Sequence, residues 1–196
     1  VIFDSPEMIS DDIVKYNNFW EFELFNKWKK YFPKEGLMLD IGANIGSHCI
    51  QFKYHFPKLK IYAFEPFKEN FDVLIQNTKR YKDVKCFNIG VGSRNSIVHF
   101  NNGHIQNSGV VRVVDHSSNP NIVLSLDDLI LDQVSFIKVD IEGHELSSFE
   151  GMRILLKKDK PLIWLEDNEN TAVPYLQSLG YKILDKETKT NDYLMI

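Results

Sequence analysis

A glycine-bearing turn between a buried apolar segment and a predicted helix has the residue types and spacing of a ligand site. The sequence LMLDIGANIG covers residues 37–46, and Glu65 ends the next apolar run, KIYAFEP. A strand that leads through a tight turn into a helix directs backbone N–H groups at the helix N-terminus toward anionic groups. A carboxylate at the end of the next strand can bind both hydroxyls of a ribose. The pattern therefore predicts a site for an adenosine-type cofactor.

The spacing of the glycines distinguishes between two kinds of cofactor. A dinucleotide fingerprint reads G-x-G-x-x-G, in which the middle glycine lets the backbone approach a pyrophosphate. Here Gly42 and Gly46 frame the turn, while Asn44 takes the middle position and Ser47 the last one. The Asn44 side chain would crowd a pyrophosphate, whereas S-adenosylmethionine has none, and Asp40 can accept a hydrogen bond from its ammonium. We therefore predict S-adenosylmethionine; the alternative is an ordinary strand–turn–helix unit without a cofactor.

The composition is that of an ordinary globular protein. Of the 196 residues, 43% are hydrophobic and 26% are charged, which allows one domain with a substantial core. The net charge of −4 provides no general positive field, so nucleic acid is not an expected partner. No apolar run approaches membrane-spanning length and no signal-peptide pattern opens the chain, so we expect a cytoplasmic protein without a membrane partner. Cys49 and Cys86 are expected to be free thiols in a reducing compartment.

Strand and helix patterns alternate along the chain, which is typical of a mostly parallel, doubly wound α/β sheet. Strands are expected at 37–41, 59–65, 84–90, 96–100 and 161–168, and one more within 135–145. Helices are expected from Ser10 to about Phe32, at about 46–56, after Pro66, and at 125–130, where Ser125 would be the cap. Residues 101–120 are predicted to be loop with one strand around 110–114, and the last sixteen residues an antiparallel hairpin.

We expect one domain over residues 1–196, with an N-terminal helical segment at 1–35 and a core at 36–196. Val1 is not a methionine, which suggests a trimmed chain or one domain of a longer protein. The predicted first helix is rich in aromatic residues. They either bury their rings against the sheet or leave one or two free to stack on a substrate.

Four segments carry a resemblance to a known family. LDIGANIG, AFEP, SLDDL with KVDIEGHE, and PLIWLE resemble the FkbM-type S-adenosylmethionine-dependent methyltransferases over residues 36–168. The resemblance implies a Rossmann-like class I methyltransferase fold with about seven strands. It also implies methylation of a hydroxyl on a sugar or sugar-bearing natural product. The cofactor site that it implies is lined by Asp40, Gly42, Ala43, Asn44, Gly46 and Glu65, with Asn88 and Ile89 flanking the adenine.

The chemistry that would follow needs a group to remove a proton. A sugar hydroxyl ionises far above neutral pH, so its methylation calls for a base or a metal ion. His144, four residues after Asp140 and in the first turn of the following helix, is the candidate base, since imidazole titrates near neutrality. Asp140 is the second candidate catalytic residue and is expected near the cofactor. The alternative for His144 is a helix-start residue bonded to nearby backbone.

A metal site is a further possibility at the predicted strand ends. Asp140, Glu166 and Asp167 could offer oxygen ligands to Mg²⁺ or Mn²⁺, which would lower the pKa of the attacked hydroxyl. Adjacent residues on a strand point to opposite faces, so Glu166 and Asp167 share an ion only if the strand has ended there. Glu142 and Glu145 are equally well explained as acids at a helix N-terminus, and a site without metal stays open.

Three functions are compatible with these observations. The leading hypothesis is an S-adenosylmethionine-dependent O-methyltransferase acting on a sugar hydroxyl of a glycan or glycosylated metabolite. The second is a catalytically silent cofactor-binding module of a larger glycan-building protein. The third, a nicotinamide-dependent oxidoreductase, is weakened by Asn44. The oligomeric state cannot be read from the sequence.

Overall fold

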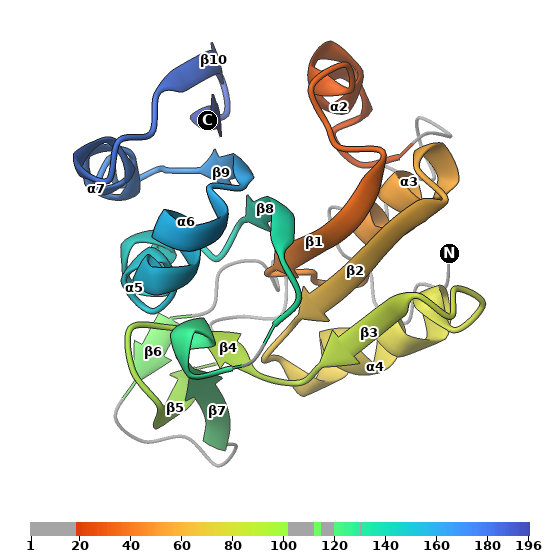
Figure 1. Ribbon diagram of the computed structural model, residues 1–196. Helices are drawn as coiled ribbons and strands as arrows, with labels where there is room; N and C mark the ends of the chain where they lie inside the picture. The colour runs from red at the N-terminus through yellow and green to blue at the C-terminus, as the bar shows by residue number, and fades with distance from the viewer. Residues whose placement is uncertain (1–18, 102–111, 115–119, 130) are drawn as a thin grey trace.

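The computed structural model describes residues 19–101, 112–114, 120–129 and 131–196 (Figure 1). Its main sheet contains β1 (Glu35–Ile41), β2 (Lys58–Phe64), β3 (Val84–Phe87), β8 (Val134–Val139), β9 (Leu162–Glu166), β10 (Ile183–Glu187) and β11 (Asp192–Met195). The order of these seven strands is β10-β11-β9-β8-β1-β2-β3. Strand β11 is antiparallel to β9 and β10, and the other neighbours are parallel. The predicted Rossmann-like fold with its C-terminal hairpin is confirmed.

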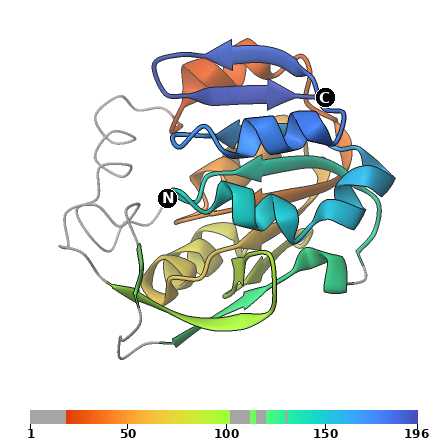
Figure 2. The same cartoon turned by 90° about the vertical axis from the view of Figure 1, so that its left-hand side faces the viewer.

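The helices cover both faces of this sheet (Figures 1 and 2). Side chains alternate along β1, so Leu37 and Leu39 join one apolar cluster while Met38 joins another. The first cluster includes residues of α5 (Glu145–Glu150), α6 (Arg153–Asp159) and α7 (Ala172–Ser178). The second includes residues of α2 (Phe22–Trp28), α3 (Ser47–His55) and α4 (Lys68–Thr78). The two clusters hold the sheet between helical layers and fix the strand ends.

Helix α2 shows what the aromatic residues near the N-terminus do. Phe25 and Trp28 are fully buried, and Phe32 in the following turn packs against Phe52 and Trp164. These three rings therefore stabilise the core, whereas the other described aromatic residues of this segment are partly buried or exposed: Phe19, Trp20, Phe22 and Tyr31. The helix ends at Trp28 rather than at Phe32, and its expected start at Ser10 lies outside the described residues.

A second, smaller sheet was not predicted. It consists of β4 (Gly90–Val91), β7 (Pro120–Leu124), β5 (Ser96–Asn101) and β6 (Arg112–Val114), in that order. The chain leaves the main sheet after Phe87, and Gly90 pairs with Val123 instead of continuing the predicted strand at 84–90. Strands β5 and β6 match the strands expected at 96–100 and around 110–114, whereas β4 and β7 were not expected, because such short strands carry little periodicity. Apart from β6, the predicted loop at 102–119 lies outside the described residues.

The segment at 125–130 folds differently from its predicted capped helix. It forms a single 3₁₀ turn at Leu126–Asp128, and the Ser125 hydroxyl donates to the Gly151 carbonyl instead of capping. Asp127 accepts hydrogen bonds from the backbone N–H groups of Ile154 and Leu155, at 2.8 and 2.9 Å. The Asp127 carboxylate thus binds N–H groups in the first turn of α6, which have no partner within their own helix.

Two simpler expectations concern cysteines and membranes. Cys49 and Cys86 are free thiols, as predicted. Within the described ranges, no helix is long and apolar enough to cross a membrane.

Candidate active site

A cavity of about 540 Å³ opens where four parallel strands of the main sheet end. Residues 42–44 follow β1, Glu65 follows β2, Asp140 follows β8, and Glu166 ends β9; all of them line the cavity. Open α/β sheets bind ligands at this carboxyl edge, and the volume suits a small organic ligand. The small sheet adds an apolar wall with Val91, Val98 and Val123.

The two glycines of the turn after β1 have different roles. Gly42 has φ 85°, and a Cβ there would lie 1.9 Å from the Asp140 carbonyl oxygen, so only glycine lets this turn approach the end of β8. Gly46 has φ 86° and packs against Leu74 of α4, where a Cβ would lie 2.8 Å from Cδ1. Gly42, Ala43 and Asn44 line the cavity, whereas Gly46 serves helix packing behind it.

Glu65 is held rigidly at the cavity wall. Its side chain is buried, with Oε2 accepting the Asn44 N–H at 2.9 Å and Oε1 accepting the Phe67 N–H at 2.8 Å. A carboxylate oxygen can accept more than one hydrogen bond, so each oxygen can also accept one from a ligand hydroxyl. The Asn88 side chain donates to the carbonyl oxygens of Glu65 and Pro66, at 2.9 Å each. Asn88 therefore braces the loop, while Ile89 lines the cavity.

Asp40 lies behind the turn and not among the residues that line the cavity. Its side chain is fully buried, and Oδ2 accepts a hydrogen bond from the Cys49 thiol at 3.1 Å. The predicted direct contact between Asp40 and a cofactor ammonium is therefore not supported by its position. The residue instead joins β1 to α3.

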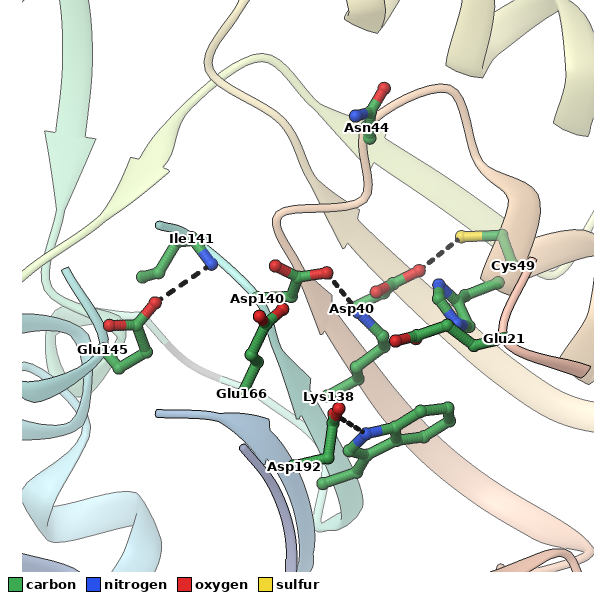
Figure 3. A network of polar contacts seen from close by, with 12 residues as sticks. Glu21, Asp40, Asn44, Cys49, Lys138, Asp140, Ile141, Glu145, Glu166 and Asp192 are labelled. Atoms are coloured by element: carbon green, nitrogen blue, oxygen red, sulfur yellow. Dashed lines mark hydrogen bonds and ion pairs between the residues drawn. The ribbon is translucent and has the colours of Figure 1, made fainter. Parts of the chain in front are cut away.

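Asp140 presents an anionic carboxylate to the cavity. Burial opposes its ionisation, but the ammonium of Lys138, whose Nζ donates to Oδ2 at 3.1 Å, lowers the pKa of Asp140 below its ordinary value. Lys138 is itself almost completely buried and lies over the Trp164 ring, 5.6 Å from its centroid. The ion pair therefore keeps a negative charge at the end of β8 (Figure 3).

Two further carboxyl groups lie close to this ion pair. Glu166 lies beside Asp140 (Figure 3), and burial together with the Asp140 charge raises the pKa of Glu166 to about 8. Glu21, which precedes α2 and has a left-handed φ of 50°, reaches the same region from the N-terminal side (Figure 3). Burial raises the pKa of Glu21 to about 7. Both groups line the cavity, and both hold protons more tightly than ordinary glutamates.

A histidine and an aspartate lie close to these groups. His48 Nε2 lies 3.1 Å from Glu21 Oε2, and burial lowers the pKa of His48 to about 3, so its imidazole is neutral. Asp192 accepts a hydrogen bond from the Trp164 indole N–H at 2.6 Å. Glu21 and His48 were not predicted from the sequence because neither belongs to a local motif, and only the packing of α2 on α3 brings them together.

His144 is the N-cap residue of α5 and lines the cavity on the same edge as Asp140. Its imidazole makes no hydrogen bond to any residue that the structure describes. The alternative, in which the His144 side chain bonds to nearby backbone at the start of the helix, is therefore not observed. The neighbouring Glu145 binds the backbone there instead, because its carboxylate accepts the N–H groups of Ile141 and Gly143, at 3.3 and 3.1 Å. His144 is therefore available to a ligand in the cavity.

The predicted three-carboxylate metal site is not assembled. Asp167 is fully buried, and its carboxylate accepts the N–H groups of Thr171 and Val173 at the start of α7, at 3.1 and 2.9 Å. Strand β9 does end at Glu166, but the chain then turns Asp167 toward the helix and away from Asp140. Across the described residues, no group of three or more His, Cys, Asp or Glu side chains is placed to hold a metal ion.

Comparison with known proteins gives a consistent assignment. The model of the methyltransferase FkbM domain matches residues 40–183. The hexuronic acid methyltransferase AglP of Haloferax volcanii is 31% identical over 125 residues, which cover 61% of this chain and 51% of that protein. The methyltransferase sdnD of Sordaria araneosa is 30% identical over 105 residues, which cover 47% of this chain and 40% of that protein. The chain thus spans about half, or less, of the length of these relatives.

A solved structure agrees in fold. The methyltransferase FkbM of Methylobacillus flagellatus KT superposes with a TM-score of 0.64 at 24% identity, over 84% of this chain and 43% of that one. The family match extends from Asp40, at the end of β1, to Ile183, at the start of β10, and so includes every strand end that forms the cavity. The chain belongs to the FkbM methyltransferase family.

Proposed function

We propose that this chain is an S-adenosylmethionine-dependent O-methyltransferase that acts on a sugar hydroxyl of a glycan or glycosylated metabolite. The observation that carries the proposal is the cavity that Glu65, Asp140 and His144 share. Family membership supports methyl transfer, and the name of the haloarchaeal relative, a hexuronic acid methyltransferase, supports a sugar acceptor.

The cavity residues fit this cofactor. The fixed carboxylate of Glu65 can accept hydrogen bonds from two ribose hydroxyls, and Ile89 with Phe67 offers apolar surface for an adenine. The cavity carries five carboxyl side chains and one guanidinium among the described residues: Glu21, Glu65, Asp140, Glu142, Glu166 and Arg94. This excess of carboxyl groups over cationic groups suits a ligand with an ammonium and a sulfonium, and it disfavours the diphosphate of a nicotinamide cofactor. When bound, S-adenosylmethionine supplies a methyl group that its sulfonium activates toward attack by oxygen.

The protein's own residues would position the acceptor and move one proton. His144 would accept the proton of the attacking hydroxyl through a ring nitrogen, since its imidazole has no other partner in the described structure. Asp140, kept anionic by Lys138, would orient the hydroxyl or stabilise the imidazolium that forms. Metal assistance is not part of this proposal, because the Asp167 carboxylate accepts N–H groups at the start of α7, and no group of three or more possible ligands is placed to hold an ion among the described residues.

Calorimetry and mass spectrometry test the proposal in sequence. Titration with S-adenosylhomocysteine should give saturable binding, whereas NADH should give none. Incubation with S-adenosylmethionine and a panel of sugars and glycosides should then add one methyl group to at least one acceptor. NADH binding without S-adenosylhomocysteine binding contradicts the cofactor assignment. Cofactor binding without transfer to any sugar would favour the catalytically silent module.

A further inference from the structure

The part of the cavity formed by Trp20, Glu21, His48, Asp140 and Glu166 is here called the acidic end. We propose that the acidic end binds an uncharged, hydroxyl-bearing face of the acceptor and excludes a carboxylate, so that the acceptor is a neutral sugar and not a uronic acid. This inference rests on the proposed function and specifies its substrate class.

The carboxyl groups of the acidic end come from three separate elements. Glu21 precedes α2, Asp140 follows β8, and Glu166 ends β9, yet their carboxyl groups lie close together (Figure 3). The nearby cation, Lys138, lies beneath them with 2% of its side chain exposed, and it is already paired with Asp140. Lys138 is not among the residues that line the cavity, and neither is Asp192 of β11, which lies next to it (Figure 3). A carboxylate ligand here would therefore meet negative or neutral oxygens and no free cation among the described residues.

The same carboxyl groups suit a sugar hydroxyl. Glu166 Oε1 accepts a hydrogen bond from Asn168 Nδ2 at 2.7 Å, and Glu21 Oε2 lies 3.1 Å from His48 Nε2. The bond from Asn168 holds the Glu166 side chain in place, and both glutamates offer oxygen atoms to hydroxyl donors. Trp20 adds a partly buried ring to the same wall, which can contact the apolar C–H face of a pyranose. Carboxyl groups beside an aromatic ring are a suitable combination for a neutral sugar.

Arg94 is the guanidinium elsewhere in the cavity, and its position argues against a role in binding an acceptor carboxylate at the acidic end. It follows β4, on the wall that the small sheet makes. The small sheet and α2 lie on opposite sides of the molecule in both views (Figures 1 and 2). Arg94 therefore provides a matched control for the charges of the acidic end.

The test compares two ligands that differ at one carbon. The full chain is first saturated with S-adenosylhomocysteine, then titrated with methyl β-D-glucopyranoside or with methyl β-D-glucopyranosiduronate, and binding is followed by NMR. We expect the glucoside to bind at least about tenfold more tightly than the glucuronoside. The comparison is made at pH 9, above the pKa of Glu166 (about 8) and of Glu21 (about 7), where both groups carry a negative charge. There Glu166→Gln and Glu21→Gln should each narrow that difference, whereas Arg94→Ala should leave it unchanged. Circular dichroism confirms that each variant is folded, and either glutamate variant is sufficient if the other does not fold.

Each other outcome counts against the inference. Equal or tighter binding of the glucuronoside overturns it, as does a glucuronoside affinity that falls in Arg94→Ala. Failure of the glucoside to bind the S-adenosylhomocysteine-saturated protein overturns it as well, while the cofactor assignment stands. If S-adenosylhomocysteine itself does not bind, the first titration shows this separately, and the proposed function fails together with the inference.

Discussion

The Lys138 ammonium donates to Oδ2 of Asp140 at 3.1 Å from a position beneath the cavity floor, where 2% of the Lys138 side chain and 28% of the Asp140 side chain are exposed. Neither residue would be ionised so readily at this depth without the other. The pair therefore links the stability of the sheet to the charge that the cavity presents. This pair and the cavity that it faces lead to four predictions.

Replacing Lys138 should destabilise the protein in a pH-dependent way. The folded pKa of Asp140 is lowered, so the pair stabilises the fold above the ordinary aspartate value of 3.8, and this contribution is lost as the pH falls through the folded pKa. Lys138→Met should lower the free energy of unfolding at neutral pH by about 3 kcal/mol, because it leaves a buried charge unpaired. Urea denaturation across pH measures this. Lys60→Met, which breaks an exposed pair with Asp132, should cost about 0.5 kcal/mol or less. If the destabilisation by Lys138→Met does not become smaller toward acid pH, the ion pair between Lys138 and Asp140 is contradicted.

The fixed carboxylate of Glu65 should matter for cofactor affinity. In Glu65→Gln the amide NH₂ replaces one acceptor, so the N–H of Asn44 or Phe67 loses its partner and a ribose hydroxyl loses its acceptor. The dissociation constant for S-adenosylhomocysteine should rise by about 10- to 100-fold. Calorimetry measures this dissociation constant, and Glu69→Gln is the control, because Glu69 is an exposed glutamate on α4. Unchanged affinity would show that Glu65 only braces the loop.

Removing the imidazole of His144 should affect turnover and leave cofactor binding intact. His144→Ala is expected to reduce kcat for methyl transfer by about 10²- to 10⁴-fold, the usual contribution of a general base. The affinity for S-adenosylhomocysteine should be nearly unchanged. Glu150→Gln, at the exposed end of the same helix, controls for general effects on α5. Full turnover in the His144 variant would exclude the residue as the base.

The raised pKa of Glu166 predicts a loss of stability at alkaline pH. A carboxyl group whose folded pKa is about 8 binds its proton more tightly in the folded state than in the unfolded one, where the value is near 4.5. Its contribution is full below the unfolded value and is lost as the pH rises through about 8. Between pH 6 and pH 9 the free energy of unfolding of the wild-type protein should fall by about 2 kcal/mol more than that of Glu166→Gln. This figure allows for screening by solvent, because Glu166 is partly exposed. Denaturant titrations of both proteins at the two pH values give the comparison. Equal losses of unfolding free energy in the two proteins would contradict the raised pKa of Glu166.

Local patterns were enough to predict the framework of this protein. The turn from Gly42 to Gly46, the carboxylate at Glu65 and the strand that leads to Asp140 are each encoded within a few residues, because apolar periodicity and glycine spacing act along the chain. Those features contributed to the fold class and to the family resemblance, and the pattern of the last sixteen residues predicted the hairpin. They also placed His144 on the cavity edge, since it follows a strand end directly.

Only the tertiary structure decided which side chains share the cavity. Asp167 turned to the N-terminus of α7 and Asn88 to the loop carbonyls, because nearby backbone groups there needed partners. Glu21 and Glu166 approach each other across most of the chain's length, through the packing of α2 against the sheet. A residue's own neighbours in sequence establish its secondary structure. The charge and proton affinity of a buried carboxyl group depend instead on groups brought near it by folding, and no local pattern records them.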